Sequence, residues 1–259
     1  MQERHTNLQQ YFNEQAITTR KFVIPYIESL KAVTKGVRVL EIGCGTGGNL
    51  VPFLDAGCVV TGVDIAVTSI DLARGFLGQR DGLTLIADDI YNRTEADGLF
   101  DIIIMRDVIE HIHNQEKFMG FVKRFMAPGA VFFLGFPPWY NPFGGHQQIV
   151  KNRVLSKLPY YHILPAGIYK MMLKLGGEVD RTIDALLEIK ETGISLERFE
   201  RICKKENFSI ERKTLYFINP NYETKFGLKP RVQWRMITAI PFVRNFFVTA
   251  GYYVLSKKG

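Results

Sequence analysis

Cysteine is scarce in this chain, and no apolar run is long enough to cross a membrane. The 259 residues include three cysteines, Cys44, Cys58 and Cys203, and none belongs to a CxxC pair. This argues against a disulfide scaffold and a structural metal site, and we expect reduced thiols in a cytoplasmic protein. The most apolar late stretch, IPFVRNFFVTAGYYVL, contains Arg244 and Asn245 and is shorter than the roughly 20 residues of a spanning helix. The polar N-terminus also lacks the apolar core of a secretion signal.

Charge is divided unevenly along an otherwise ordinary globular composition. Apolar residues make up 46% and charged residues 23% of the chain, which excludes extended disorder. Residues 1–150 contain 13 Lys and Arg against 16 Asp and Glu, a net charge of −3, whereas residues 151–259 contain 20 against 10, a net charge of +10. A basic region of this kind attracts an acidic substrate, an anionic membrane surface or nucleic acid, or it is simply a solvated face.

Short apolar runs alternate with amphipathic stretches over the first 140 residues. This alternation predicts a doubly wound α/β sheet, because parallel strands need helical crossovers and become buried on both faces. The expected strands are 37–42, 58–65, 83–90, 100–107 and 130–136, followed by 208–218 and 245–258.

The pattern divides the chain into four parts. The strands are preceded by a helical stretch, Leu8 to Ala32, which we expect Pro25 to divide. After the fifth strand comes a loop rich in proline, glycine and aromatic residues, and Ser195 is the expected N-cap of a later helix. We therefore expect an N-terminal helical cap at 1–36, a cofactor-binding core at 37–136, a helical lid at 137–194, and a C-terminal completion of the sheet at 195–259 with an insertion near 219–244.

A glycine-rich turn follows the first expected strand. Gly43, Gly45 and Gly48 satisfy GxGxxG, and Asp64 lies 21 residues beyond Gly43 at the end of the second strand. Glycines allow a tight turn and a close ligand approach, and the following helix offers free N–H groups. An acid at this spacing suits ribose hydroxyls. Taken alone, these residues fit NAD and S-adenosylmethionine (SAM) about equally.

The wider sequence separates the two cofactors. VLEIGCGTGGNL resembles motif I of the class I SAM-dependent methyltransferases, with Glu41 as the acid before the first glycine. The resemblance continues in order through VVTGVDI, LIADDI, FDIIIMRDVIEHI and MAPGAVFFLGF. The EH element is similar to that of small-molecule methyltransferases of the ubiquinone-biosynthesis type. This resemblance implies a Rossmann-like, seven-stranded mixed sheet with helices on both faces, a lid after strand five, and SAM as the cofactor.

The resemblance also implies roles for individual residues. Gly43, Cys44, Gly45 and Gly47 would line the methionine and ribose portions of SAM, and Glu41 would order the turn through backbone N–H groups. Asp64 would accept hydrogen bonds from both ribose hydroxyls. Ile65 would pack on adenine, whose edge Asp88, Asp89 and Ile90 would bind. Arg106 would offer its carbonyl to the SAM ammonium, while its side chain pairs with an acid or reaches the substrate.

Methyl transfer from a sulfonium needs alignment and, for a hydroxyl or ammonium acceptor, a base. The candidates are His146, Asp107 and His111. His146 lies in a Pro/Gly-rich loop just beyond the fifth strand, where crevices open in such sheets. His111 belongs to the EH element, and we expect it to shape the cofactor site rather than to act as the base. Trp139, Tyr140 and Phe143 either form an acceptor wall or anchor the loop. Arg20 either binds the SAM carboxylate or forms a surface ion pair.

We therefore expect an enzyme that methylates an oxygen or nitrogen atom of a small molecule. The stretch from Lys151 to Leu175 interleaves basic and apolar residues, which suits an acidic or amphiphilic acceptor, or weak peripheral membrane contact, as well as a solvated lid helix. No nucleic-acid partner and no metal are expected. The alternatives are a catalytically silent SAM-binding or partner-binding module and an NAD-dependent oxidoreductase; the latter does not account for LIADDI or for the EH element.

Overall fold

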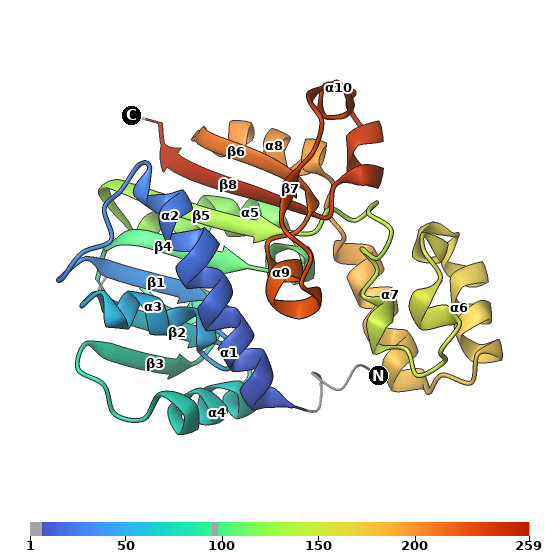
Figure 1. Ribbon diagram of the computed structural model, residues 1–259, viewed down its shortest axis with the longest axis horizontal. Helices are drawn as coiled ribbons and strands as arrows, with labels where there is room; N and C mark the ends of the chain where they lie inside the picture. Colours follow the sequence, from blue (N-terminus) through green and yellow to red (C-terminus); the bar gives the residue numbers. More distant parts are fainter. Residues whose placement is uncertain (1–6, 95–97, 259) are drawn as a thin grey trace.

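The computed structural model describes residues 7–94 and 98–258, so the first six residues of the expected cap lie outside it. An eight-stranded sheet runs through the molecule in the order β3-β2-β1-β4-β5-β8-β6-β7 (Figure 1). The strands are β1 Arg38–Ile42, β2 Val59–Asp64, β3 Leu83–Ala87, β4 Phe100–Arg106, β5 Met126–Phe136, β6 Phe208–Ile218, β7 Arg231–Val232 and β8 Ala250–Lys257. The first five pair in parallel, while β8 is antiparallel to β5 and β6, and β7 is antiparallel to β6.

The expected Rossmann-like mixed sheet is confirmed, with two differences in detail. The described chain has eight strands rather than seven, because the two-residue strand β7 forms within the 219–244 insertion and pairs with β6. The last strand begins at Ala250 rather than at 245, because Val243–Phe247 forms a 3-10 helix.

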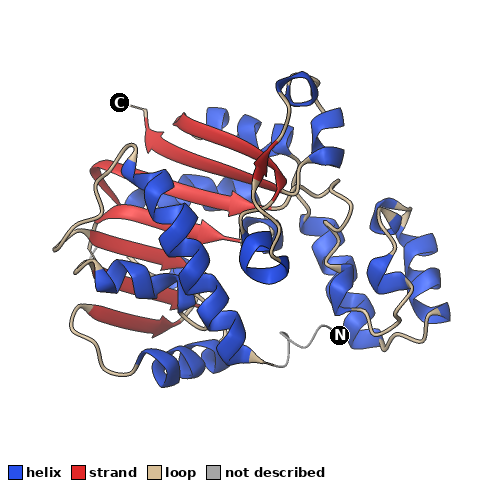
Figure 2. Cartoon of the chain, in the orientation of Figure 1, coloured by secondary structure: helices blue, strands red, loops and turns tan. Residues whose placement is uncertain are grey.

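Helices cover both faces of the sheet (Figure 2). Their bounds are α1 Leu8–Thr18, α2 Ile24–Glu28, α3 Val51–Asp55, α4 Val67–Leu77, α5 Gln115–Val122, α6 Ala166–Leu175, α7 Asp180–Thr192, α8 Leu196–Lys205, α9 Asn221–Phe226 and α10 Arg235–Thr238. One apolar cluster packs α5 and α8 against one face of the sheet. A second cluster packs the four helices from α1 through α4 against the opposite face. Strand β4 serves both: Ile103 and Met105 face one cluster, Ile102 and Ile104 the other, as the two-residue period of a strand requires.

Pro25 does not break the N-terminal helical stretch. A π-helical turn, Thr19–Val23, links α1 to α2, and Pro25 lies in the first turn of α2. Proline fits there because the first turn of a helix leaves its N–H groups without intrahelical partners. Ser195 is the N-cap of α8, as expected, and its side chain accepts a hydrogen bond from the Arg198 N–H.

The segment after β5 folds around a small core of its own. Helices α6 and α7, with short 3-10 turns before them, bury an apolar cluster that includes Tyr169, Leu173 and Ile183. The two ends of the segment meet, because the Trp139 N–H donates to the Ile194 carbonyl at 2.8 Å. Figure 1 shows α6 and α7 beyond the carboxyl ends of the parallel strands. Among the described helices, none is long and apolar enough to cross a bilayer.

Candidate functional site

The glycine turn lies at the carboxyl end of β1 and uses backbone conformations that favour glycine. The φ angles are +72° at Gly43, +53° at Gly45 and +82° at Gly47. A Cβ on Gly43 would lie 2.5 Å from a methyl carbon of Val108, whereas one on Gly45 would meet no atom within 4 Å. Gly43 therefore keeps the turn packed on the chain after β4, and Gly45 leaves open space beside its backbone, as a cofactor cradle requires. Cys44 is buried, and its N–H donates to the Val63 carbonyl.

Asp64 ends β2 directly beside this turn. Its Oδ2 accepts a hydrogen bond from the Gly45 N–H at 2.8 Å, and its Oδ1 accepts one from the Ala66 N–H at 2.9 Å. Each carboxylate oxygen has two lone pairs, so both retain capacity for a ribose hydroxyl. The neighbouring Ile65 side chain is 73% exposed, which leaves an apolar surface for an adenine ring. These residues fit the ribose and adenine portions of SAM.

Asp88 and Asp89, at the end of β3, are engaged mainly with their own turn. Asp88 Oδ1 accepts hydrogen bonds from Asn92 Nδ2 and from the Asp89 N–H, both at 2.8 Å. These bonds, with the nearby Arg93, hold the pKa of Asp88 below its usual value. Asp89 Oδ1 caps the following 3-10 turn by accepting from the Tyr91 N–H. An adenine amino group would therefore compete with Asn92 for Asp88, while the Ile90 side chain is buried.

A buried polar network connects β1, the strand before the glycine turn, to β4. Asn49 Nδ2 donates to Glu41 Oε1 at 2.6 Å, and Asn49 Oδ1 accepts from Arg106 Nη1 at 2.7 Å and from Thr19 Oγ1 at 2.8 Å. Arg106 Nη2 donates to Asn221 Oδ1 at 2.5 Å. Glu41 thus bonds to a side chain rather than to the backbone N–H groups that the sequence led us to expect. The Arg106 guanidinium bonds to neutral oxygens, not directly to an acid.

Glu41 carries an unsatisfied buried oxygen. Its side chain is fully buried, and Oε2 has no hydrogen-bond partner among the described residues. Burial raises the pKa of Glu41 to about 8, although the bond from Asn49 and the charge of Arg106 oppose the shift. An orphaned carboxylate oxygen beneath the glycine turn is compatible with a cationic group bound above it.

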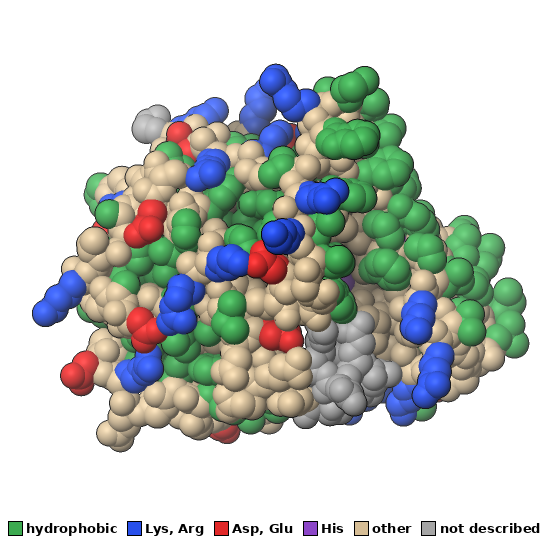
Figure 3. Space-filling view, viewed as in Figure 1, with side chains coloured by type: hydrophobic (Ala, Val, Ile, Leu, Met, Phe, Trp, Pro, Cys, Tyr) green, Lys and Arg blue, Asp and Glu red, His purple; other side chains and the backbone are tan. Residues whose placement is uncertain are grey.

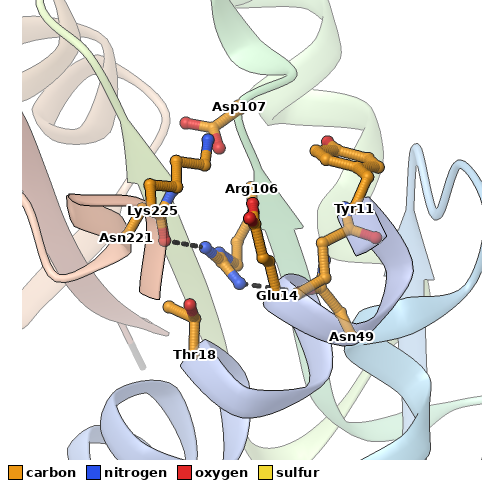
Figure 4. Close-up of a pocket in the computed structure, with 9 residues that line it drawn as sticks. Tyr11, Glu14, Thr18, Asn49, Arg106, Asp107, Asn221 and Lys225 are labelled. Carbon is orange, nitrogen blue, oxygen red and sulfur yellow. Dashed lines mark hydrogen bonds between the residues drawn. The ribbon is translucent and has the colours of Figure 1, made fainter. Parts of the chain in front are cut away.

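A polar pocket of about 320 Å³, open solvent included, lies at the carboxyl end of β4 (Figure 4). Helix α1, the 3-10 turn Gly48–Leu50, the end of β4, and α9 from the 219–244 insertion supply its walls. Burial raises the pKa of Tyr11 to about 12, so its phenol stays protonated. The lining residues are Tyr11, Glu14, Gln15, Thr18, Asn49, Arg106, Asp107, Asn221 and Lys225.

His146, His111 and Glu110 form a second cluster. The His146 Nε2 lies 3.8 Å from Glu110 Oε1, and the rings of His146 and His111 lie 4.9 Å apart, edge to face. Burial and the charge of Asp107 raise the pKa of Glu110 well above its usual value, and neither of its oxygens has a hydrogen-bond partner in the described chain. The three side chains place one ligand atom each within 4.8 Å of one another, a donor set that can hold a divalent metal, although the sequence predicted none.

Other expected site residues have structural contacts instead. Trp139 is only 8% exposed; its ring packs on the His162 ring at 4.7 Å, and Gly193 leaves room for it, so it anchors the insertion after β5. Tyr140 packs on Phe246. Arg20 forms an exposed ion pair with Asp55, which is the second of its two expected roles. It does not line the pocket.

The structure adds residues that the sequence did not single out. Asn49 follows Gly48 immediately, so its position beside the turn was a usable signal. Asn221 and Lys225 lie in an insertion with no recognisable motif, and only the fold brings them to β4. Glu110 was noticed as half of the EH element, but nothing in the sequence linked it to His146.

Comparisons with known proteins agree with this arrangement. A family model described as a methyltransferase domain matches residues 8–148, more than half of the chain. The ubiquinone biosynthesis O-methyltransferase of Brucella anthropi is 32% identical over 105 residues, which cover 38% of this chain and 40% of that protein. The match thus spans less than half the length of this curated relative.

Solved structures show the same fold at low identity. The plantazolicin methyltransferase BpumL, in complex with SAH, aligns over 99% of this chain and 87% of its own with a TM-score of 0.54 and 12% identity. Magnesium protoporphyrin IX methyltransferase from Synechocystis PCC 6803, with bound SAH, aligns over 93% and 82% with a TM-score of 0.52 and 16% identity. The family match, together with the glycine turn and Asp64 at the carboxyl edge of the sheet, shows that this chain belongs to the class I SAM-dependent methyltransferase family.

Proposed function

We propose that this protein transfers a methyl group from SAM to an oxygen or nitrogen atom of a small-molecule acceptor. The position of the polar pocket supports this most directly: Arg106 and Asp107, which line it, lie at the same edge of the sheet as Gly45 and Asp64. Strand β4 pairs with β1, and β1 with β2, so a molecule bound over the glycine turn would extend toward the pocket. Ligands of open α/β sheets bind at this edge.

SAM supplies, when bound, a methyl group activated by its positive sulfur. The chain would hold it through Asp64 on the ribose hydroxyls, the Gly43–Gly47 turn along the methionine portion, and Ile65 against adenine. Glu41 holds Asn49, which in turn orients Arg106, whose backbone carbonyl would face the ammonium. Asp88, Asp89 and Ile90 would border the adenine edge.

The base has two candidates supported by different observations. Asp107 lines the pocket and is exposed to it. His146 has the chemistry best suited to a neutral-pH base, and the buried carboxyl group of Glu110, whose pKa is raised, lies 3.8 Å from its Nε2. His111 packs against the His146 ring, which suits a positioning role. We propose His146 as the base, with Asp107 positioning the acceptor.

The acceptor is proposed to be acidic or amphiphilic. The Arg106 and Lys225 side chains line the pocket alongside Glu14 and Asp107, and the C-terminal part of the chain carries the excess of positive charge. We further propose that two segments, residues 137–194 and 219–244, enclose the acceptor. Helix α6 is proposed to make at most weak membrane contact. The protein is proposed to act in the cytoplasm. Three free, buried cysteines support the last point.

Two measurements test this function. Calorimetric titration with S-adenosylhomocysteine should show binding, whereas NADH should not bind; the reverse result would exclude a methyltransferase. A cell extract incubated with the protein and methyl-labelled SAM should then carry the label in its low-molecular-weight filtrate, and Asp64→Ala protein should leave the filtrate unlabelled. Label in the protein fraction would exclude a small-molecule acceptor, and binding without any label would indicate a silent SAM-binding module.

A further inference from the structure

Large apolar side chains are concentrated on the surface of one short segment, residues 234–247. Met236 is 83% exposed, Trp234 76% and Phe242 62%, and Ile240, Val243 and Phe247 are also exposed. Single exposed apolar residues are normal, whereas a group this dense marks an interaction site. Figure 3 shows hydrophobic side chains gathered on the side of the molecule that carries α10, with basic side chains beside them. We call residues 234–247 the apolar loop.

The fold holds the apolar loop in place. The Glu197 carboxylate accepts hydrogen bonds from the Phe242 N–H at 2.9 Å, from Arg244 Nε at 2.8 Å and from Asn245 Nδ2 at 2.6 Å. Phe242 has a φ angle of +63°, a left-handed conformation that is costly for an aromatic residue. Glu197 binds the N–H of this strained residue and two side chains that follow it, so the fold itself holds the exposed Phe242 ring in place.

The sequence around the apolar loop carries charge of one sign, and the acids packed against the loop, Glu197 and Glu200, are paired with its Arg244. Glu223 is the last acidic residue of the sequence, and residues 224–259 contain seven Lys and Arg. Lys229, Arg231 and Arg235 are exposed, and none of them forms an ion pair within residues 7–94 and 98–258. A self-complementary contact between two copies would bring these cations together, which opposes dimerisation. An anionic bilayer instead complements them, and tryptophan favours the level of lipid headgroups.

The other apolar surface of the molecule is less well matched to such a bilayer. Helix α6 exposes Met171 and Leu175 beside Lys170 and Lys174. The next helix, α7, carries Asp180, Asp184, Glu188 and Glu191, however, so negative charge lies close to that surface. The apolar loop has no acidic residue at all.

The 219–244 insertion carries most of the apolar loop and also two residues that line the pocket, Asn221 and Lys225. Helix α9 begins it with Asn221, which bonds to Arg106 in the pocket, and the loop follows after β7. We infer that the apolar loop docks this protein on an anionic lipid bilayer, with Trp234, Met236 and Phe242 entering the headgroup region and Lys229, Arg231 and Arg235 binding lipid phosphates.

Sedimentation with vesicles tests the docking without cofactor or acceptor, so its outcome is independent of methyl transfer. The full chain should bind phosphatidylcholine–phosphatidylglycerol vesicles at about 50 mM salt, bind phosphatidylcholine alone much less, and lose most binding at about 500 mM salt. Trp234→Ser/Met236→Ser should weaken binding at least about tenfold. Lys229→Glu/Arg231→Glu should remove the preference for the anionic lipid.

A matched variant and a spectroscopic signal complete the test. Met171→Ser/Leu175→Ser removes two other exposed apolar side chains, on α6, and should bind vesicles like the wild type. The chain has two tryptophans, and Trp139 is buried, so a blue shift of the emission on adding vesicles reports Trp234. Absence of salt-sensitive binding, loss of binding in the α6 variant alone, or a dimer in solution that Trp234→Ser/Met236→Ser dissociates would each overturn the inference.

Discussion

The guanidinium of Arg106, at the end of β4, donates a hydrogen bond to the side-chain oxygen of Asn49 at 2.7 Å, and both side chains are buried. Asn49 in turn donates to Glu41 on β1, so one amide connects a buried cation to a buried acid. Such an amide serves as both donor and acceptor, and no apolar residue can replace it without leaving buried polar groups of Glu41 and Arg106 unsatisfied.

Asn49→Ala should therefore destabilise the protein by at least about 2 kcal/mol, since Glu41, Arg106 and Thr19 each lose a partner in the interior. Urea unfolding followed by circular dichroism measures this. Asn13→Ala, on the exposed side of α1, is the control and should change stability by less than about 0.5 kcal/mol. Equal effects of the two substitutions would mean that the network contributes nothing specific.

Asp64→Ala should weaken SAM binding more than about tenfold, because hydrogen bonds to a charged acceptor contribute roughly 1.5–3 kcal/mol each. The substitution also removes the acceptor of the Gly45 N–H, which loosens the turn. Asp71→Ala, in the exposed part of α4, should leave affinity unchanged. Calorimetric titration decides, and affinity within threefold of the wild type would make Asp64 a helix cap only.

The sequence was sufficient to predict that the glycine turn and Asp64 lie together. The glycine turn and Asp64 are local features: each follows directly from a strand, and parallel strands end at one edge of a sheet. Their proximity therefore depends only on strand order. The eighth strand was missed because β7 has two residues, too few for any periodic pattern.

The contacts of the proposed acceptor pocket could not be predicted in the same way. Asn221 reaches Arg106 across 115 positions of sequence, through an insertion whose path depends on tertiary packing. Glu110 meets His146 because the lid folds back against the end of β4, and no spacing rule encodes that contact. The sequence did identify His146 as unusual, but its partner became visible only in the fold.

Glu41 should make stability depend on pH. Its pKa is raised by burial to about 8, above the ordinary value of about 4.5, so the folded state holds the proton more tightly than the unfolded chain. The contribution of protonated Glu41 to the free energy of unfolding is fully present below about pH 4.5. As the pH rises toward 8, this contribution is lost by up to about 1.4 kcal/mol per pH unit.

Glu41→Gln removes this titration. Unfolding free energies of the variant and the wild type, measured at several pH values, should therefore diverge in favour of the variant between about pH 5 and pH 8. A constant difference across this range would show that Glu41 is ionised in the fold even at the lower pH.

His146→Gln should lower kcat about a hundredfold while leaving SAM affinity unchanged, because it removes a base without touching the glycine turn. Asp107→Asn should act mainly on the acceptor KM, since Asp107 lines the pocket. Glu110→Gln should reduce kcat by less than His146→Gln, because Glu110 acts through the imidazole.

If a chelator abolishes activity and Zn²⁺ restores it, Glu110, His111 and His146 are metal ligands instead, and the assignment of His146 as the base is wrong. If Asp107→Asn lowers kcat more than His146→Gln does, the base is the carboxylate that lines the pocket.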